Sequence, residues 1–312
     1  MNVIEVRGLV KRYRHADRDA LDAVSFQVAA GQLFCLLGPN GAGKSTAVAI
    51  LTTTLRPTAG RARVAGWDLA SQPARVRREI GIVFQQPSVD VNLTAEENLR
   101  LHAVLYGLYP WRPSYRSMPA SYRHAVRELA EVLDLGAALH HRVATLSGGT
   151  RRKLEIVRAL LHRPRVLFLD EPSTGLDPQA RRDLWDYLRQ VRAASGTTIV
   201  LTTHYLAEAE AADAVCILVG GRIVEHGTPG ELRARHSGAD LELDAADRNA
   251  LRRDLDRLGL PITGSGPLRV PLHRHSAQQI ITAVHVELTR LDILRPSLEE
   301  AYLQLLQQTA DP

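Results

Sequence analysis

The sequence predicts an α/β fold, and three apolar runs carry that prediction. LFCLL, VLFLD and TTIVLTT are short and continuous, which is typical of strands covered on both faces of a parallel sheet. Helical patterns lie between them, and a length of 312 residues allows one large α/β domain and a smaller second one. Open α/β sheets bind their ligands at the carboxyl ends of their strands, so we look for chemistry there.

Composition narrows the function classes. The net charge is +5, but the arginines are spread along the chain in short clusters, and only 5% of the residues are aromatic. Nucleic-acid binding depends on phosphate neutralisation, and single-strand binding also uses aromatic side chains for stacking. A dispersed, arginine-rich composition explains the charge more simply. We therefore expect no nucleic-acid partner.

Secretion and membrane insertion are not indicated. The opening stretch MNVIEVRGLVKRY lacks the apolar segment of a secretory signal, and no apolar run approaches the roughly 18–20 residues that span a bilayer. Membrane association is therefore expected only through a partner. The two cysteines, Cys35 and Cys216, lie inside apolar runs, and we expect them to be buried core residues rather than disulfide or metal ligands.

The first 30 residues predict a β-hairpin or meander. Two short apolar runs flank the polar turn RYRHADRDA, and Gly31 closes the pair. The turn carries Tyr13, which by residue type alone is an ordinary surface side chain.

The first buried run leads into a phosphate-binding motif. The stretch GPNGAGKST fits G-x-x-x-x-G-K-[ST] between a predicted strand and a predicted helix, the context that the motif requires. Glycines let successive backbone N–H groups turn toward phosphate oxygens, and the helix adds the positive end of its dipole. The nucleotide-binding residues predicted are Gly38, Pro39, Asn40, Gly41, Ala42, Gly43, Lys44, Ser45 and Thr46. Lys44 is expected on the β- and γ-phosphates, and Ser45 on magnesium.

The chain then predicts a short β segment, a basic stretch and a helical region. GRARVAGWDL is the β segment, and the apolar run IGIVF that follows the basic stretch ends at Gln85. From Asn92 to Leu146 the pattern is helical. The loop PWRPSYRSMP, together with the preceding Tyr109, carries more aromatic area than a loop needs, so Tyr109, Trp111 and Tyr115 are predicted to help in docking a partner.

The stretch from Leu146 to Pro178 combines a turn, a helix, a strand and two acids. Ser147, Gly148 and Gly149 form the turn. Leu154, Val157 and Leu161 recur at helical spacing, with basic residues between them, and Pro164 ends the helix. The buried run VLFLD then delivers Asp170 and Glu171 to the carboxyl end of a strand. Glu171 taken alone is also explained as an ordinary strand-end acid.

The chain after Pro178 is predicted to complete the α/β core and then to form a second domain. A helix precedes TTIVLTT, which ends at His204, and a helix and two short strands complete the core. From about Leu232, strands alternate with helices, which indicates a small α+β domain. His273 and His275 alternate at a strand end in that domain, and we expect no metal site there.

Together these motifs resemble the nucleotide-binding subunit of an ABC transporter. GPNGAGKST matches the family's Walker A loop, VLFLDE its Walker B strand, and Leu146 to Gly149 its signature turn. Gln85, His204 and the loop ending at Asp177 match the glutamine loop, the histidine switch and the loop after Walker B. The resemblance implies a P-loop NTPase core of the RecA-like type, with a β subdomain and a helical subdomain. It assigns residues 1–231 to the nucleotide-binding domain, with the helical subdomain near 86–150, and residues 232–312 to an accessory domain.

The resemblance also implies how the site works. Two subunits, expected to be identical, face head to tail, and each ATP lies between Walker A of one chain and the signature turn of the other, so Ser147, Gly148 and Gly149 serve the partner's ATP. Asp170, Ser45 and Gln85 are implied as magnesium ligands and Glu171 as the group that polarises the attacking water. His204 and Gln85 complete the catalytic group, Asp177 lies in the interface loop, and Tyr13 stacks on adenine. The cofactors implied are ATP and Mg²⁺.

Within the family, the single Walker A motif and the tail PSLEEAYLQL resemble the drug-exporter branch, typified by daunorubicin-resistance and NodI-type ATPases. That branch works with a separate ABC-2 type permease, which implies a location on the cytoplasmic face of the membrane. The signature departs from the common LSGGQ by ending in Thr150, and the helical insertion is longer than the usual joint.

Two alternatives remain in view, and a third is excluded. An importer ATPase shares the same motifs and differs from the exporter branch only in its tail. A non-transport ABC ATPase acting on nucleic acid or ribosomes usually carries two cassettes, a long coiled coil or a zinc module, and none of these patterns is present in the sequence. A P-loop kinase or GTPase does not explain the signature turn or His204.

Overall fold

The computed structural model describes residues 1–236, 240–272, 276–294 and 297–310. The chain divides into two compact units, Met1–His226 and Gly227–Pro312. His273 and His275, for which no metal site was expected, lie outside the described residues. No helix in the described parts of the chain is long and apolar enough to cross a bilayer.

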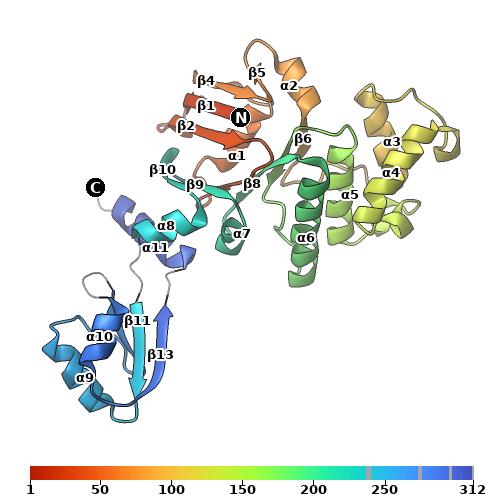
Figure 1. Cartoon of the computed structure of the whole chain (residues 1–312). Helices are drawn as coiled ribbons and strands as arrows, with labels where there is room; N and C mark the ends of the chain where they lie inside the picture. Colours follow the sequence, from red (N-terminus) through yellow and green to blue (C-terminus); the bar gives the residue numbers. More distant parts are fainter. Residues whose placement is uncertain (237–239, 273–275, 295–296, 311–312) are drawn as a thin grey trace. The chain divides into compact units, whose positions relative to one another are not determined.

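A six-stranded sheet forms the centre of the first unit (Figure 1). Its strand order is β10-β9-β3-β8-β7-β6, and the pairs from β9 through to β6 are parallel. The strands are β3 (Leu33–Leu37), β6 (Ile80–Val83), β7 (Val166–Asp170), β8 (Thr198–Thr203), β9 (Ala214–Val219) and β10 (Arg222–Gly227). Every residue of β3, β7 and β8 is buried, so both faces are covered, as the continuous apolar runs predict. The α/β prediction is confirmed.

Helices lie between these parallel strands along the chain. They are α1 (Lys44–Leu51), α2 (Pro73–Glu79), α5 (Gly148–Leu160), α6 (Pro178–Ser195) and α7 (Leu206–Glu210). Helix α2 was not predicted, because it is short and buries only Val76, which leaves no periodicity to detect. Pro73 at its first turn is the local signal for its start.

The N-terminal residues form the predicted antiparallel sheet. Its order is β2-β1-β4-β5, with β1 (Asn2–Lys11), β2 (Leu21–Ala29), β4 (Ala59–Val64) and β5 (Trp67–Asp68). One hydrophobic core joins this sheet, α1 and the six-stranded sheet. Phe26 and Phe34, from the two sheets, stack with ring centroids 5.3 Å apart. Helix α1, which follows the phosphate loop, is therefore anchored by both sheets.

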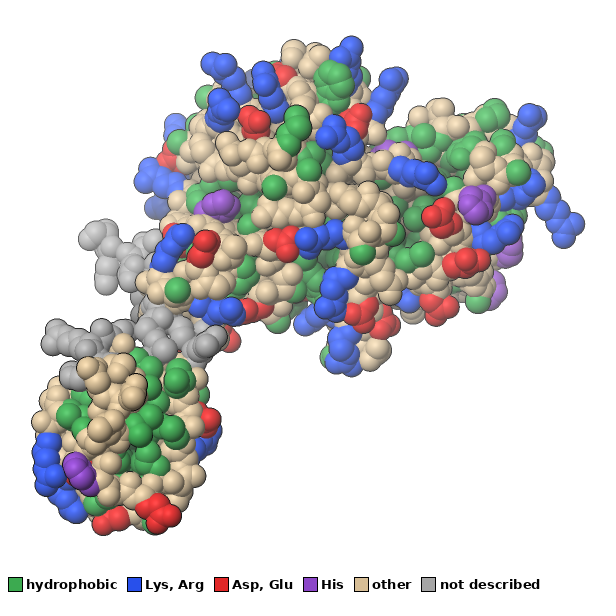
Figure 2. All heavy atoms as spheres, in the orientation of Figure 1, with side chains coloured by type: hydrophobic (Ala, Val, Ile, Leu, Met, Phe, Trp, Pro, Cys, Tyr) green, Lys and Arg blue, Asp and Glu red, His purple; other side chains and the backbone are tan. Residues whose placement is uncertain are grey.

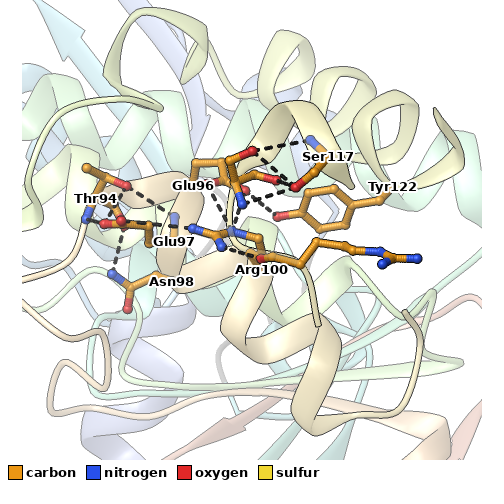
Figure 3. A network of polar contacts seen from close by, with 9 residues as sticks. Thr94, Glu96, Glu97, Asn98, Arg100, Ser117 and Tyr122 are labelled. Atoms are coloured by element: carbon orange, nitrogen blue, oxygen red, sulfur yellow. Dashed lines mark hydrogen bonds and ion pairs between the residues drawn. The ribbon is translucent and has the colours of Figure 1, made fainter. Parts of the chain in front are cut away.

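Between β6 and α5 the chain forms a helical region with α3 (Ala95–Leu105) and α4 (Ala120–Val132) (Figure 1). A buried polar network fixes it (Figure 3). Glu96, 4% exposed, accepts hydrogen bonds from Arg100 Nε at 3.2 Å and from the Tyr122 hydroxyl at 3.2 Å. Arg100 Nη1 also donates to the Arg112 carbonyl at 2.7 Å, so the network ties the inserted loop to α3.

The three aromatic residues of the insertion do not share one role. Tyr109 and Tyr115 both pack edge-on against the buried Tyr122, with centroids 5.4 and 6.2 Å away. Trp111 is 64% exposed. Two of the three residues predicted to dock a partner therefore hold the insertion on its own subdomain, and Trp111 alone offers an exposed ring.

The second unit is the predicted α+β arrangement. A three-stranded antiparallel sheet has the order β12-β11-β13, and its buried face packs on α9 and α10 in a core of its own. Its elements are α8 (Pro229–His236), β11 (Asp240–Ala245), α9 (Arg248–Arg257), β12 (Leu268–Pro271), α10 (Ala277–Ala283), β13 (Leu288–Leu294) and α11 (Leu298–Ala310).

Both cysteines are free and buried, as predicted. Cys35 lies on β3 and Cys216 on the adjacent β9. Burial raises the pKa of the Cys35 thiol well above its usual value, and burial raises the pKa of Cys216 to about 12. Both are therefore protonated core side chains at neutral pH.

Candidate nucleotide-binding and catalytic site

The predicted site residues follow the carboxyl ends of four neighbouring parallel strands. The phosphate loop begins after β3, Gln85 lies just past β6, Asp170 ends β7, and His204 follows β8. The sheet order β3-β8-β7-β6 places these ends side by side. The sheet edge therefore gathers residues that are far apart in the sequence.

Two glycines of the phosphate loop are required by its geometry. Gly43 has φ of 104°, and a Cβ there would lie 2.3 Å from the Ala20 carbonyl oxygen. A Cβ on Gly38 would lie 2.2 Å from the Leu218 carbonyl oxygen. Any larger residue at either position displaces backbone, so the loop closes only with glycine.

Lys44 lies inside the loop that it follows. Its side chain is 4% exposed, and Nζ donates to the carbonyls of Gly38 at 2.7 Å and Pro39 at 3.1 Å. Nζ is also 3.8 Å from Glu171 Oε1. Burial lowers the pKa of Lys44, and the negative charges of Glu171 and Asp170 oppose that shift. A phosphate group in the loop would supply further charge that favours the protonated ammonium.

Asp170 and Ser45 bring two oxygen ligands together. The Ser45 hydroxyl donates to Asp170 Oδ1 at 3.2 Å, and the Thr202 hydroxyl donates to the same oxygen at 2.5 Å. Among the described residues, no group of three or more His, Cys, Asp and Glu could hold a metal ion by itself. Mg²⁺ is typically held by one or two protein oxygens, with phosphates and water completing its shell, so a Ser45–Asp170 pair fits it.

Glu171 is the centre of the group. Oε1 is 3.8 Å from Lys44 Nζ and 3.5 Å from His204 Nδ1, and Oε2 accepts from Gln85 Nε2 at 3.3 Å. The Thr174 hydroxyl donates to Oε2 as well, at 3.2 Å. The predicted Lys44, Gln85 and His204 thus converge on one carboxylate, which is 9% exposed.

The backbone of Glu171 holds the carboxylate in place. Its φ is 46°, in the left-handed region that side-chain-bearing residues seldom adopt. The Glu171 N–H donates to the Thr202 hydroxyl at 3.0 Å and to the Thr202 carbonyl at 3.2 Å. Thr202 therefore supports both acids at the end of β7.

Tyr13 lies beside the phosphate loop. Its hydroxyl is 3.2 Å from Thr46 Oγ1, and the Lys11 ammonium lies over its ring, 5.4 Å from the centroid. The ring is 45% exposed. This places an available aromatic face next to the first turn of α1.

The signature turn and Asp177 form a second group. Ser147 caps α5: its Oγ accepts from the Thr150 N–H at 3.1 Å and lies 2.8 Å from the Thr150 hydroxyl. Asp177 caps α6 by accepting from the N–H groups of Gln179 and Ala180, both at 2.9 Å. A pocket of about 280 Å³ lies between the turn and the start of α6, with Ser147, Gly149, Thr150 and Asp177 in its wall. The residues thus fall into two groups: one around Glu171, the other on the exposed start of α5.

Sequence reasoning missed three residues of the site. Thr174 and Thr202 were not singled out, because a threonine in or near a strand is common. The position of Thr202, two residues before His204, was the only sequence signal for it. Arg152 was only one of the basic residues between the apolar positions of its helix and was given no role, but it is 8% exposed and binds backbone around Glu171. The signal available was the spacing of Arg152, Glu155 and Arg158 along one face.

Comparison with known proteins gives a consistent result. A family model described as ABC transporter matches residues 21–174. The chain is 38% identical to the daunorubicin/doxorubicin resistance ATP-binding protein DrrA of Streptomyces peucetius, over 99% of this chain and 93% of that protein. It is 39% identical to the Nod factor export ATP-binding protein I of Ralstonia nicotianae, over 85% of this chain and 79% of that protein.

Solved structures agree. An ATP-binding subunit of an ABC transporter superposes with a TM-score of 0.64 at 33% identity, over 75% of this chain and 92% of that one. A dimeric ATP-binding cassette in a post-hydrolysis state with ADP and Pi superposes with a TM-score of 0.64 at 25% identity, over 72% of this chain and 98% of that one. The predicted P-loop NTPase fold and the predicted resemblance are confirmed.

Proposed function

The chain belongs to the ABC transporter family as an ATP-hydrolysing subunit, and we propose that it powers the export of a small drug-like molecule through a separate membrane permease. For ATP hydrolysis the strongest support is the convergence of Lys44, Gln85 and His204 on Glu171. For export, the strongest support is the similarity to a drug-resistance protein, which extends over almost the whole chain and includes the second unit.

The residues of the phosphate loop bind and orient the nucleotide. Backbone N–H groups at the start of α1 face the phosphates, and the Lys44 ammonium neutralises charge on the β- and γ-phosphates. Lys44 then exchanges its contacts with the Gly38 and Pro39 carbonyls for phosphate oxygens. The Tyr13 ring stacks on adenine, a contact worth about 1–3 kcal/mol by analogy with base–aromatic stacking.

Ser45 and Asp170 would hold Mg²⁺, with Gln85 reaching the same region. The ion, when bound, neutralises the charge that develops on the β- and γ-phosphate oxygens. The Thr202 hydroxyl bond keeps Asp170 Oδ1 oriented toward Ser45.

Glu171 polarises the attacking water. Its carboxylate lies between Lys44 on one side and Gln85 and His204 on the others, so a water that it orients would face the terminal phosphate. His204 and Gln85 hold the carboxylate and sense whether that phosphate is present. The left-handed backbone of Glu171 aims the side chain into the site.

Two chains form the working unit. The chain carries one Walker A motif and one signature turn, each capable of binding an anion at a helix start. Head-to-tail pairing of two copies places each ATP between Lys44 of one chain and Ser147 of the other. ATP binding closes the pair, because its phosphate contacts exist only when both chains meet it, and hydrolysis reopens it.

The membrane partner is proposed to be an ABC-2 type permease, which would hold the pair at the cytoplasmic face of the membrane. On the face that Figure 2 shows, the Lys and Arg side chains of the first unit lie at many separate places, as their spread in the sequence suggests. That distribution does not favour a nucleic-acid substrate.

Glu171→Gln tests the catalytic assignment. The purified variant should lose ATP turnover by about a thousandfold or more, since it keeps the shape of the side chain but not its charge. It should retain ATP binding and accumulate as an ATP-held dimer. Turnover is measured by steady-state phosphate release, and ATP binding with a fluorescent nucleotide. Dimer formation is measured by size-exclusion chromatography with light scattering.

Glu128→Gln is the matched control, because Glu128 lies on α4, is about half exposed and pairs with Arg163 at 3.8 Å. It should turn over like wild type. A Glu171→Gln chain that hydrolyses ATP at near wild-type rate would contradict the role of Glu171. Export itself is tested in right-side-out vesicles that contain this chain and a candidate permease and that are loaded with ATP. ATP-dependent efflux of daunorubicin is expected, and ATP-dependent uptake instead would favour the importer alternative.

A further inference from the structure

Helix α5 carries a buried polar stripe. Arg152, Glu155 and Arg158 follow one another at three-residue spacing, so they share one face of the helix. Arg152 is 8% exposed and Glu155 is 1% exposed. A charged face that is buried must bind something specific, since an unpaired buried charge is strongly unfavourable.

Arg152 binds the backbone of the catalytic end of β7. Its Nε donates to the Pro172 carbonyl at 3.0 Å, and Nη2 lies 3.2 Å from the Asp170 carbonyl and 3.4 Å from the Glu171 carbonyl. The guanidinium therefore contacts the two acids of the site and the residue after them.

The same guanidinium binds the segment that carries Gln85. Arg152 Nη1 donates to the Phe84 carbonyl at 2.6 Å and to Glu155 Oε2 at 2.9 Å. Hence one rigid, planar group joins α5, the end of β7 and the end of β6. A lysine ammonium carries its three donors on one atom and has no planar fork, so it cannot span these separated acceptors.

Glu155 and Arg158 bind the other end of the Gln85 segment. Glu155 Oε1 accepts from the Ser88 N–H at 2.6 Å, and Arg158 Nη1 donates to the Ser88 carbonyl at 2.6 Å. Phe84 and Ser88 are thus both fastened to α5, with Gln85 between them.

We propose that Arg152 is the positioning residue through which ATP at the signature end of α5 sets the catalytic geometry of Glu171 and Gln85 in the same chain. Ser147 caps the helix that bears Arg152 one and a half turns later. Any shift of α5 on binding the partner's ATP must carry the carbonyls of Glu171 and Phe84 with it, because letting go would leave a buried guanidinium unpaired. The inference rests on the proposed role of Ser147, Gly148 and Gly149 as the partner-ATP site.

Full-length Arg152→Gln and Arg152→Lys chains test the proposal. Both should lower kcat by about tenfold or more while half-saturation by ATP changes by about threefold or less. The dependence of rate on ATP concentration should lose its cooperativity, with the Hill coefficient falling to about 1. Combined with Glu171→Gln, Arg152→Gln should still form the ATP-held dimer, because both ATP-contacting surfaces remain.

Arg100→Gln is the matched control for lost stability. Arg100 is also a largely buried arginine with a carboxylate and a carbonyl partner, but its partners Glu96 and Arg112 belong to the helical region (Figure 3). It should lower the melting temperature and keep kcat and the Hill coefficient of wild type.

The outcomes separate cleanly. Wild-type kcat and cooperativity in Arg152→Gln would overturn the proposal, and so would full activity in Arg152→Lys. If Arg100→Gln, at a similar fall in melting temperature, loses as much activity as Arg152→Gln, the loss reflects stability alone and the proposal is overturned as well. If the wild-type chain shows no ATP turnover, both the proposed function and the inference fail. If wild type hydrolyses ATP and Glu171→Gln does not, the proposed function stands and the Arg152 variants test the inference alone.

Discussion

At the scale of single residues, the hydroxyl of Thr150 changes what Ser147 can do. Ser147 Oγ already accepts the Thr150 N–H, and the Thr150 hydroxyl lies 2.8 Å away. When Thr150 donates, both lone pairs of the serine oxygen are occupied, and its own proton is left for an outside acceptor. We therefore propose that a threonine in place of the common glutamine leaves Ser147 ready to donate to a phosphate oxygen.

Thr150→Val should weaken ATP-driven dimerisation, because valine keeps the shape and loses the hydroxyl. In a Glu171→Gln background, the ATP concentration for half-maximal dimer should rise about fivefold, the equivalent of one hydrogen bond of about 1 kcal/mol. Light scattering across an ATP titration measures it. Thr150→Ser should behave as wild type, and equal weakening by both variants would show that the hydroxyl is not the cause.

A second residue-scale feature is the neutral histidine His102. Its ring packs against Tyr106 in a tilted arrangement with a centroid distance of 4.2 Å, and Tyr106 packs in the same way against His162 at 4.6 Å. Burial, helped by the charges of Arg158 and His162, lowers the pKa of His102 to about 3. The ring therefore stays neutral in the folded chain at all but strongly acidic pH.

This pKa predicts acid sensitivity with a definite sign. An unfolded histidine takes up a proton below about pH 6.5, whereas folded His102 does so only near pH 3, so unfolding binds a proton between these values. The stability contributed by neutral His102 is complete above about pH 6.5 and is lost as the pH falls toward 3.

His102→Leu should therefore reduce the drop in melting temperature between pH 7 and pH 5 relative to wild type. Differential scanning fluorimetry at both pH values measures the drop. His124→Gln, at an exposed position on α4, serves as the control and should keep the wild-type drop. An unchanged drop in His102→Leu would mean that other groups dominate acid unfolding.

Residue by residue, local motifs were predictable and long-range supports were not. Lys44, Ser45 and Glu171 were found because a Gly-rich loop and a strand-end acid pair carry their own sequence patterns. Thr202 was not, because its bond to Asp170 joins two neighbouring strands and leaves no local pattern. The roles assigned to the site residues stay predictions until variants are measured.

At the scale of elements, strands were easier to predict than the polar side of a helix. A continuous apolar run such as VLFLD directly indicates a strand that is covered on both faces. Helix α5 was predicted from its apolar positions, and no role was assigned to its charged positions. Arg152 and Glu155 face two loops, which no periodicity of hydrophobic residues reveals.

The polar network of the helical region makes an element-scale prediction (Figure 3). Burial raises the pKa of Tyr122, so its hydroxyl remains a donor to the buried Glu96. Tyr122→Phe should lower the free energy of unfolding by about 1–2 kcal/mol, because Glu96 loses one donor without solvent to replace it. ATP turnover should stay within about twofold of wild type.

Chemical denaturation measures that change, and Trp111→Ala is its control. Trp111 is exposed, so its removal should alter stability by about 0.5 kcal/mol or less. A Tyr122→Phe chain as stable as wild type would indicate that Arg100 alone satisfies Glu96.

At the scale of the whole molecule, one chain carries two separate groups of residues, which we propose are halves of two different sites. The residues around Glu171 and the exposed signature turn belong to separate groups in the structure. The sequence motifs identified both groups, but a single chain contains no information on which copy completes which site. Identical-chain pairing stays a proposal, as does the division of labour between the two units.

Mixing two inactive variants tests head-to-tail pairing. Lys44→Ala removes one half-site and Ser147→Arg the other, so neither homodimer holds a complete site. In a mixed dimer, Lys44 of one chain meets Ser147 of the other, and one site is whole. An equal mixture should recover at most about a quarter of wild-type phosphate release, because half of randomly paired dimers are mixed and each has one intact site. That site uses Glu171 of the Ser147→Arg chain, whose own signature turn no longer holds ATP, so the coupling proposed through Arg152 should lower the recovery by about a further tenfold.

Phosphate release by the mixture no greater than the mean of the separate variants would contradict head-to-tail pairing of identical chains. The mixture should also elute as a dimer in the presence of ATP.

The burial of Cys35 and Cys216 has a practical consequence. The chain has these two cysteines only, and both thiols are enclosed and held protonated, so maleimides and mild oxidants should leave the native protein unmodified. A cysteine introduced on the surface would then be the sole reactive thiol. Spectroscopic probes or cross-linkers can therefore be attached to the wild-type background without first removing its own cysteines, and opening and closing of the pair can be followed from a single labelled position.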